Sequence, residues 1–144
     1  MTPEDFKYIS TLIKGQSGLT LTEDKAYLLE SRLLPVARKQ GMESLEQLIA
    51  KLKASNDRAL ITDVTEAMTT NESFFFRDQK PFDLFRDILL PEMMEKRAAQ
   101  KSVKIWCAAA SSGQEPYTIS ILLKEAAAKL AGWNCSILGT DISH

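Results

Sequence analysis

Apolar residues recur every three or four positions through the first hundred residues, which is the spacing of helices with one buried face. Helix start signals accompany this pattern. Thr2 and Pro3 suit an N-cap and a first helical residue, and Ser44 with Gln47 has the spacing of a capping box. Pro35 is expected to kink or end the second helix. The pattern predicts helices with these apolar positions: Phe6, Ile9 and Ile13; Ala26, Leu29 and Leu33; Leu45, Leu48, Ile49 and Leu52; Leu60, Ile61, Val64 and Met68; Phe82, Phe85 and Leu89.

The pattern changes after residue 100. Residues 101–107 alternate and are rich in β-forming side chains, and residues 108–113 are a run of small residues. A helix is predicted from Glu115 to about Leu130, and a second strand over residues 135–141. This order is that of the first βαβ unit of a parallel, doubly wound sheet, so we expect an α+β chain with an all-α N-terminal domain.

Composition and charge exclude several classes of protein. The 144 residues carry a net charge of −1, whereas proteins that bind nucleic acid usually have a basic excess. No run of 18 apolar residues is present, so no membrane insertion is expected, and the acidic N-terminus is unlike a signal peptide. Cys107 and Cys135 lack the spacing of a metal site and are interpreted as two buried thiols, which favours a reducing, cytoplasmic location.

The segment from the first strand to the second has the layout of a ligand site. Small residues let a ligand approach the backbone, and the following helix N-terminus offers free N–H groups. Asp141, at the end of the second strand, is placed to accept hydrogen bonds from ribose hydroxyls. The loop has only one glycine, Gly113, which suits a pyrophosphate poorly. These residues alone leave a structural βαβ unit and a nucleoside site equally open.

Two longer motifs resemble those of CheR-type chemoreceptor glutamate O-methyltransferases. One is Trp106-Cys-Ala-Ala-Ala-Ser-Ser-Gly-Gln-Glu-Pro-Tyr117, a small-residue run ending in Gly-x-Glu-Pro-Tyr, and the other is Thr70-Asn71-Glu72-Ser73-Phe74-Phe75-Phe76-Arg77. A third segment, Leu29-Glu-Ser-Arg-Leu33, resembles the basic helix of that family's N-terminal domain. The resemblance spans nearly the whole chain. It implies a Rossmann-like methyltransferase sheet that uses S-adenosylmethionine and methylates glutamates of chemotaxis receptors.

The resemblance also assigns roles to single residues. It implies that Asn71, Ser73 and Arg77 face the cofactor, with Ser73 standing where the family usually has Thr. Glu115 would contact the cofactor from the helix start, and Asp141 would hold the ribose. Arg77 is in addition the candidate catalytic residue, for substrate orientation or for cofactor contact. Without the motif, a turn or helix cap would be the better interpretation of Asn71 and Ser73, and a surface charge that of Arg77. The three phenylalanines of this motif are expected to pack in the core and to clamp the segment.

Lys25, Arg32 and Lys39 repeat every seven residues and would form a basic stripe on a continuous helix. The stripe has two interpretations, a solvated face or a docking surface for an acidic partner, and the first is the commoner one. The resemblance implies the second, with the glutamate-bearing receptor helices as partner.

The resemblance divides the chain into a receptor-docking domain at residues 1–69, a cofactor-facing loop with linker helices at 70–100, and the start of the methyltransferase domain at 101–144. Because the chain stops after the second strand, we expect a truncated sheet, little activity in isolation and self-association, with a domain-swapped dimer as one form. Four large side chains are expected to stay exposed on the sheet: Ile105, Trp106, Ile137 and Leu138. The alternatives are a non-catalytic receptor- or signalling-protein-binding module and, less favoured, a nicotinamide-dependent oxidoreductase.

Overall fold

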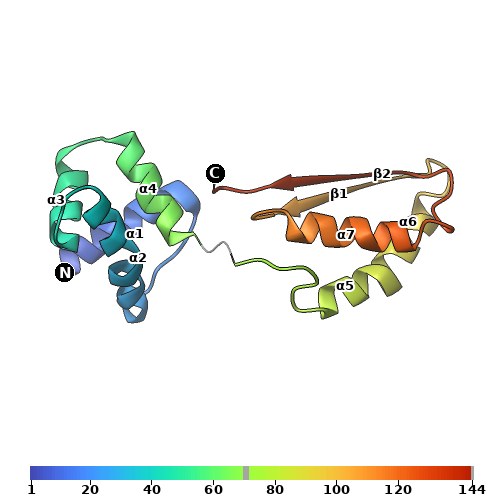
Figure 1. Cartoon of the computed structure of the whole chain (residues 1–144), viewed down its shortest axis with the longest axis horizontal. Helices are drawn as coiled ribbons and strands as arrows, with labels where there is room; N and C mark the ends of the chain where they lie inside the picture. The colour runs from blue at the N-terminus through green and yellow to red at the C-terminus, as the bar shows by residue number, and fades with distance from the viewer. Residues whose placement is uncertain (70–71, 144) are drawn as a thin grey trace. The chain divides into compact units, whose positions relative to one another are not determined.

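The computed structural model describes residues 1–69 and 72–143 and divides the chain into two compact units. We call Met1–Thr70 the N-terminal unit and Asn71–His144 the C-terminal unit. The predicted α+β fold is confirmed: helices are followed by a two-stranded parallel sheet (Figure 1). The elements in chain order are α1 (Pro3–Ser17), η1 (Glu23–Lys25), α2 (Ala26–Lys39), α3 (Leu45–Ala54), α4 (Arg58–Met68), α5 (Lys80–Leu84), η2 (Phe85–Leu89), α6 (Leu90–Lys96), β1 (Ser102–Ala108), α7 (Gln114–Glu125) and β2 (Asn134–Thr140).

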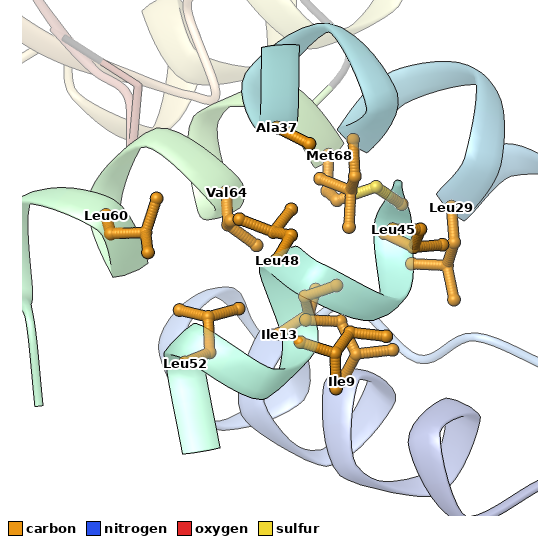
Figure 2. Close-up of a cluster of buried hydrophobic side chains, with 12 residues drawn as sticks. Ile9, Ile13, Leu29, Ala37, Leu45, Leu48, Leu52, Leu60, Val64 and Met68 are labelled. Carbon is orange, nitrogen blue, oxygen red and sulfur yellow. The ribbon is translucent and has the colours of Figure 1, made fainter. Parts of the chain in front are cut away.

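The N-terminal unit is built around one apolar core to which each of its four α-helices contributes (Figure 2). The predicted apolar stripes are the ones that meet there. Burying a large aliphatic side chain stabilises a fold by about 1.5–3 kcal/mol, so this cluster is the main reason that the helices assemble. The fully or almost fully buried residues are Ile9, Ile13, Leu29, Leu33, Ala37, Leu45, Leu48, Ile49, Leu52, Leu60, Val64 and Met68.

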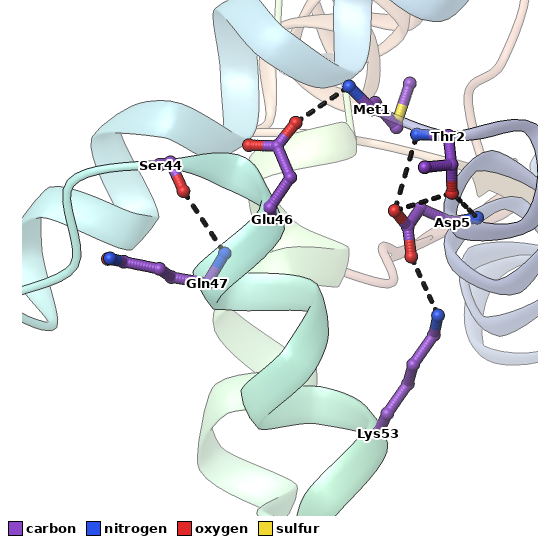
Figure 3. Close-up of polar contacts among 7 residues, drawn as sticks. All are labelled: Met1, Thr2, Asp5, Ser44, Glu46, Gln47 and Lys53. Atoms are coloured by element: carbon purple, nitrogen blue, oxygen red, sulfur yellow. Dashed lines mark hydrogen bonds and ion pairs between the residues drawn. The ribbon is translucent and has the colours of Figure 1, made fainter.

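Polar contacts fix the start of α1 and tie it to α3 (Figure 3). The backbone N–H of Asp5 donates to Oγ1 of Thr2 (3.2 Å), and the Asp5 carboxylate accepts from the backbone N–H of Thr2 (3.3 Å), which completes a capping box. Lys53 Nζ donates to the same carboxylate at 2.7 Å, and the Met1 ammonium lies 2.7 Å from Glu46. The N-terminus is therefore anchored at two points on α3.

Some boundaries differ from the sequence pattern. The 3₁₀ turn η1 follows Thr22, so α2 begins only at Ala26. Pro35 does not end α2, which continues to Lys39. The carbonyl that Pro35 leaves without its helical donor is that of Ser31, on the exposed side of the helix, where water can replace the lost hydrogen bond.

The helical stretch from α5 to α6 runs through a wider turn. Between them, η2 is π-helical, and the N–H of Leu90 donates to the carbonyl of Phe85, five residues back. Pro91 explains this geometry, because its ring would collide with the carbonyl of Asp87 in a regular α-helix. The helix thus accommodates Pro91 by a π-turn and continues into α6.

The sheet has one covered and one open face. β1 and β2 pair in parallel, with Ile105 opposite Ile137 and Trp106 opposite Leu138, and α7 runs alongside them (Figure 1). Trp106 and Leu138 are 69% and 62% exposed, as expected. The expectation was wrong for Ile105 and Ile137, which are half-buried because they pack with Cys107 and the apolar residues of α7.

Candidate cofactor site

The loop that joins β1 to α7 has an unusual backbone. Ala109 and Ser111 adopt left-handed conformations (φ 62° and 50°), and Gly113 follows at φ 103°. A left-handed residue with a side chain costs about 1–2 kcal/mol, and such residues gather at ligand sites. Hydrogen bonds hold the loop in this form: Ala110 N–H donates to the carbonyl of Thr140 at the end of β2 (2.9 Å), and Gly113 N–H donates to that of Ala110 (2.9 Å).

Gly139 allows the loop to lie directly on the second strand. A Cβ at this position would be 3.0 Å from Cβ of Ala110 and 3.3 Å from Cγ of Pro116, in the first turn of α7. Both distances are shorter than ordinary van der Waals contact. Only glycine lets the loop, the helix start and the strand approach this closely. The sequence signal was a glycine inside a strand pattern, which marks such close approaches.

Asp141 joins the end of β2 to the loop. Its Oδ2 accepts from the backbone N–H of Ser111 (2.7 Å), and its Oδ1 accepts from that of Ser143 (2.8 Å). These hydrogen bonds, that from Ser143 first, hold the pKa of Asp141 below its ordinary value. An exposed pocket of about 430 Å³ opens beside this carboxylate, lined by Ala110, Gly113, Pro116, Tyr117, Ser120, Ile137, Gly139, Thr140 and Asp141.

A second carboxylate, Glu115, follows the loop in the first turn of α7. Glu115 is exposed, and it neighbours the buried thiol of Cys107. Burial, followed by the charge of Glu115, raises the pKa of the Cys107 thiol. Two carboxylates at one loop favour a ligand with ribose hydroxyls and cationic groups and repel a pyrophosphate. These two negatively charged acceptors fit S-adenosylmethionine, which carries a sulfonium, an amino group and no phosphate.

The motif segment before α5 carries two more predicted residues. Ser73 is half-buried, and Arg77 is exposed and donates through Nη1 to the carbonyl of Glu72 (2.6 Å). Asn71, the third predicted residue of this motif, lies outside the residues that the structure describes.

The phenylalanines of this segment behave differently from one another. Phe76 packs edge-on against Phe82, with ring centres 5.8 Å apart, and joins the core of the C-terminal unit. Phe74 and Phe75 are 52% and 55% exposed. The expectation of core packing is therefore confirmed for Phe76 and wrong for Phe74 and Phe75, because both lie on an irregular stretch and turn that expose their side chains.

Thr118 was missed by sequence reasoning. It is fully buried, and its hydroxyl donates to the carbonyl of Gln114 (2.7 Å) and accepts from the backbone N–H of Phe76 (3.2 Å). A polar residue on the same helical face as Ile119 and Leu122 was the available signal.

The three predicted docking residues have different surroundings in the N-terminal unit. Lys25 lies in η1 and Lys39 ends α2, and both are exposed. Arg32 is half-buried, and its Nη1 donates to the carbonyl of Met68 at the end of α4 (3.0 Å). Arg32 thus serves as a C-terminal cap for α4.

Comparisons with known proteins agree with this architecture. Residues 4–69 match the family described as "CheR methyltransferase, all-alpha domain", and residues 71–144 match "CheR methyltransferase, SAM binding domain". S-adenosylmethionine is accordingly the ligand of this second domain. Over residues 1–69 and 72–143, no helix has both the length and the apolar character needed to cross a membrane.

Curated relatives resemble the chain over almost all of its length. "Chemotaxis protein methyltransferase" of Vibrio parahaemolyticus is 39% identical and "Chemotaxis protein methyltransferase 1" of Vibrio cholerae is 38% identical, each over 99% of this chain and 52% of the relative. "Chemotaxis protein methyltransferase" of Borreliella burgdorferi is 32% identical over the same shares. The chain spans about half the length of the curated relatives it matches. Two adjacent domain matches and these relatives show that the chain belongs to the CheR methyltransferase family.

Proposed function

We propose that the protein transfers a methyl group from S-adenosylmethionine to the side-chain carboxylate of glutamates on chemotaxis receptors, giving glutamate methyl ester and S-adenosylhomocysteine. Family membership and the names of the relatives support a chemotaxis methyltransferase. The observation that carries the proposal is a pair of carboxylates beside the loop between β1 and α7: Asp141, which follows β2 and holds the Ser111 N–H, and Glu115, in the first turn of α7. The glutamate acceptor rests on the resemblance of the two sequence motifs.

The chemistry asks for alignment rather than for a base. When bound, S-adenosylmethionine supplies a methyl group already activated by its sulfonium, which the acceptor carboxylate displaces from sulfur. A glutamate side chain has a pKa of about 4.3 and is already an anion at neutral pH, so no proton has to be removed. The protein's contribution is to bring acceptor and donor into line and to desolvate the carboxylate. We propose that Asp141 holds the ribose and that Glu115 binds the cationic part of the ligand.

Arg77 is the residue we propose to act next to the reacting groups. Its guanidinium is exposed and has five N–H donors, one of which holds the Glu72 carbonyl. A guanidinium beside the acceptor would replace the water that the carboxylate loses, through a charge-assisted hydrogen bond. Contact with the cofactor is the other role open to it. Ser73, four residues earlier, and Asn71 complete the proposed cofactor contacts of this motif.

Residues 1–69 are proposed as the receptor-docking domain, 70–100 as the cofactor-facing segment and 101–144 as the start of the methyltransferase domain. Lys25 and Lys39 are exposed cations that suit a glutamate-rich receptor helix, mainly through association rate and register. Arg32, which also donates to the last carbonyl of α4, is the third residue proposed for this surface. A cytoplasmic location is part of the proposal, supported by the free thiols Cys107 and Cys135.

Methyl incorporation tests the activity. The full-length protein, labelled S-adenosylmethionine and receptor cytoplasmic fragments should give base-labile methyl esters. Base-stable product, or none with several receptors, would contradict the proposal. We expect no turnover by the 144-residue chain alone, because the chain spans about half of its relatives.

Calorimetry tests the cofactor site and separates the alternatives. S-adenosylhomocysteine should bind the full-length protein, and Asp141→Ala should weaken binding roughly tenfold, as expected for loss of a charge-assisted hydrogen bond. Asp24→Ala, an exposed carboxylate of the N-terminal unit, is the matched control and should bind like wild type. Binding of NAD instead would favour an oxidoreductase, and binding of neither ligand would favour a non-catalytic receptor-binding module.

A further inference from the structure

One hydroxyl group links the two motifs of the C-terminal unit. Thr118 lies in the second turn of α7, and it is the buried polar side chain of the described residues. Its Oγ1 donates to the carbonyl of Gln114 (2.7 Å) and accepts the backbone N–H of Phe76 (3.2 Å), a residue 42 positions away. A structural role for the helix alone would need only the first of these hydrogen bonds.

The second hydrogen bond falls where the motif segment turns. Phe76 is left-handed (φ 56°), and so are Asp78 and Gln79 (φ 62° and 44°). Such a turn has no helix or strand ladder to hold it, and each left-handed residue adds to its cost. The Phe76 ring is anchored in the core next to Phe82, and the Thr118 hydroxyl fixes the backbone of the same residue. Within the turn the N–H of Gln79 donates to the carbonyl of Phe76 (3.0 Å), and the contacts of Phe76 with Phe82 and Thr118 tie the turn to the rest of the C-terminal unit.

We propose that Thr118 is a positioning residue for the cofactor site, which sets the motif segment against the start of α7. The inference rests on the function proposed above. Arg77 directly follows Phe76, and Ser73 precedes it by three residues. Glu115 precedes Thr118 by three residues, about one helical turn. The Thr118–Phe76 hydrogen bond thus fixes the distance between the groups of one motif and the carboxylate of the other.

Two variants of the full-length protein separate the hydroxyl from the shape of the side chain. Thr118→Val keeps the shape and removes the acceptor, whereas Thr118→Ser keeps the acceptor and removes a methyl group. Thr62→Val is the chemical control, since Thr62 makes the same bond to the carbonyl four residues back (2.9 Å) on an exposed face of α4. Leu122→Ala controls for lost stability, because Leu122 is buried one turn further along α7. Thr118→Ala serves if Thr118→Val does not fold.

The readouts are the dissociation constant for S-adenosylhomocysteine by calorimetry and the exchange rate of the Phe76 amide hydrogen. Thr118→Val should weaken binding about tenfold and speed Phe76 exchange at least as much, about the effect of one lost hydrogen bond. Thr118→Ser should restore both, while Thr62→Val and Leu122→Ala should leave affinity close to wild type.

Each failure has its own signature. If wild type binds S-adenosylhomocysteine and Thr118→Val binds it equally well, the positioning role is wrong even where the melting temperature falls. The same holds if Phe76 exchange accelerates without a change in affinity, or if Leu122→Ala weakens binding as much as Thr118→Val. A wild-type protein that does not bind S-adenosylhomocysteine would refute the proposed function instead, and the inference with it.

Discussion

Replacing Gly139 by alanine should destabilise the C-terminal unit. The added Cβ would lie 3.0 Å from Cβ of Ala110 and 3.3 Å from Cγ of Pro116, whereas carbon atoms prefer about 3.5–4.0 Å. Neither neighbour is the loose end of a long side chain. Ala110 is buried and its N–H is bonded to Thr140, and Pro116 is part of the first turn of α7. The loop or the helix start must move, and overpacking of this kind costs about 1–3 kcal/mol.

Urea unfolding followed by tryptophan fluorescence measures this cost. Both tryptophans of the chain, Trp106 and Trp133, belong to the C-terminal unit, so their emission reports on that unit. Gly15→Ala is the matched control, because Gly15 lies inside α1 and its added Cβ would meet nothing within 4 Å. That substitution should stabilise the N-terminal unit by about 0.5–1 kcal/mol, read from far-ultraviolet circular dichroism.

The direction of the change in unfolding free energy shows whether the added Cβ meets a clash. Without a clash, Gly139→Ala would stabilise the unit by about 0.4–1 kcal/mol, because alanine restricts the unfolded chain. An unfolding free energy equal to or above that of wild type would therefore refute the close packing of loop on strand. In the full-length protein, the displaced loop should also weaken binding of S-adenosylhomocysteine, which calorimetry measures.

Three further outcomes are expected. Hydrogen bonds, led by that from Lys53, lower the pKa of Asp5 from 3.8 to about 2. The stabilising effect of the Asp5 carboxylate is therefore present above about pH 4 and is lost as the pH falls towards 2. The difference in unfolding free energy between wild type and Asp5→Asn should vanish over that range. Arg32→Met should lower the unfolding free energy of the N-terminal unit by about 1 kcal/mol in urea, since the last carbonyl of α4 loses its donor; an unchanged value would contradict the capping role. The 144-residue chain should self-associate in light scattering, and Trp106→Gln with Leu138→Gln should reduce this; equal association of both forms would exclude the open sheet face as its cause.

The helices of the N-terminal unit could be predicted because their signal is local. Ile9 and Ile13, or Leu29 and Leu33, lie four residues apart, and the spacing alone states which side is buried. The spacing of apolar residues could not predict features that depend on the surroundings of a single backbone or side-chain group. Pro35 is tolerated because the carbonyl of Ser31, which loses its helical donor, lies on the exposed side of α2. The spacing of apolar residues does not reveal this.

In the candidate site, too, local sequence signals could be interpreted and long-range contacts could not. The position of Asp141 beside the loop could be predicted from its place at the end of a strand, since parallel strands bring their carboxyl ends to one edge. Thr118 and Gly139 could not, because their importance comes from partners far away in sequence, the Phe76 N–H in one case and Ala110 in the other. A buried hydroxyl and a strand glycine signal that something approaches closely, but the partner is known only from the fold.

The carboxylate of Asp141 explains why the loop can do without more glycines. Ala109 and Ser111 hold left-handed conformations that glycine would adopt at no cost, and the Ser111 N–H is tied to Oδ2 of Asp141. An ionised carboxylate accepts up to about four hydrogen bonds, so Asp141 can support the loop and still accept from a ribose. Because the loop is already held before a ligand arrives, less ordering remains to oppose binding. The residue that would recognise the ribose therefore also pre-organises the backbone around it.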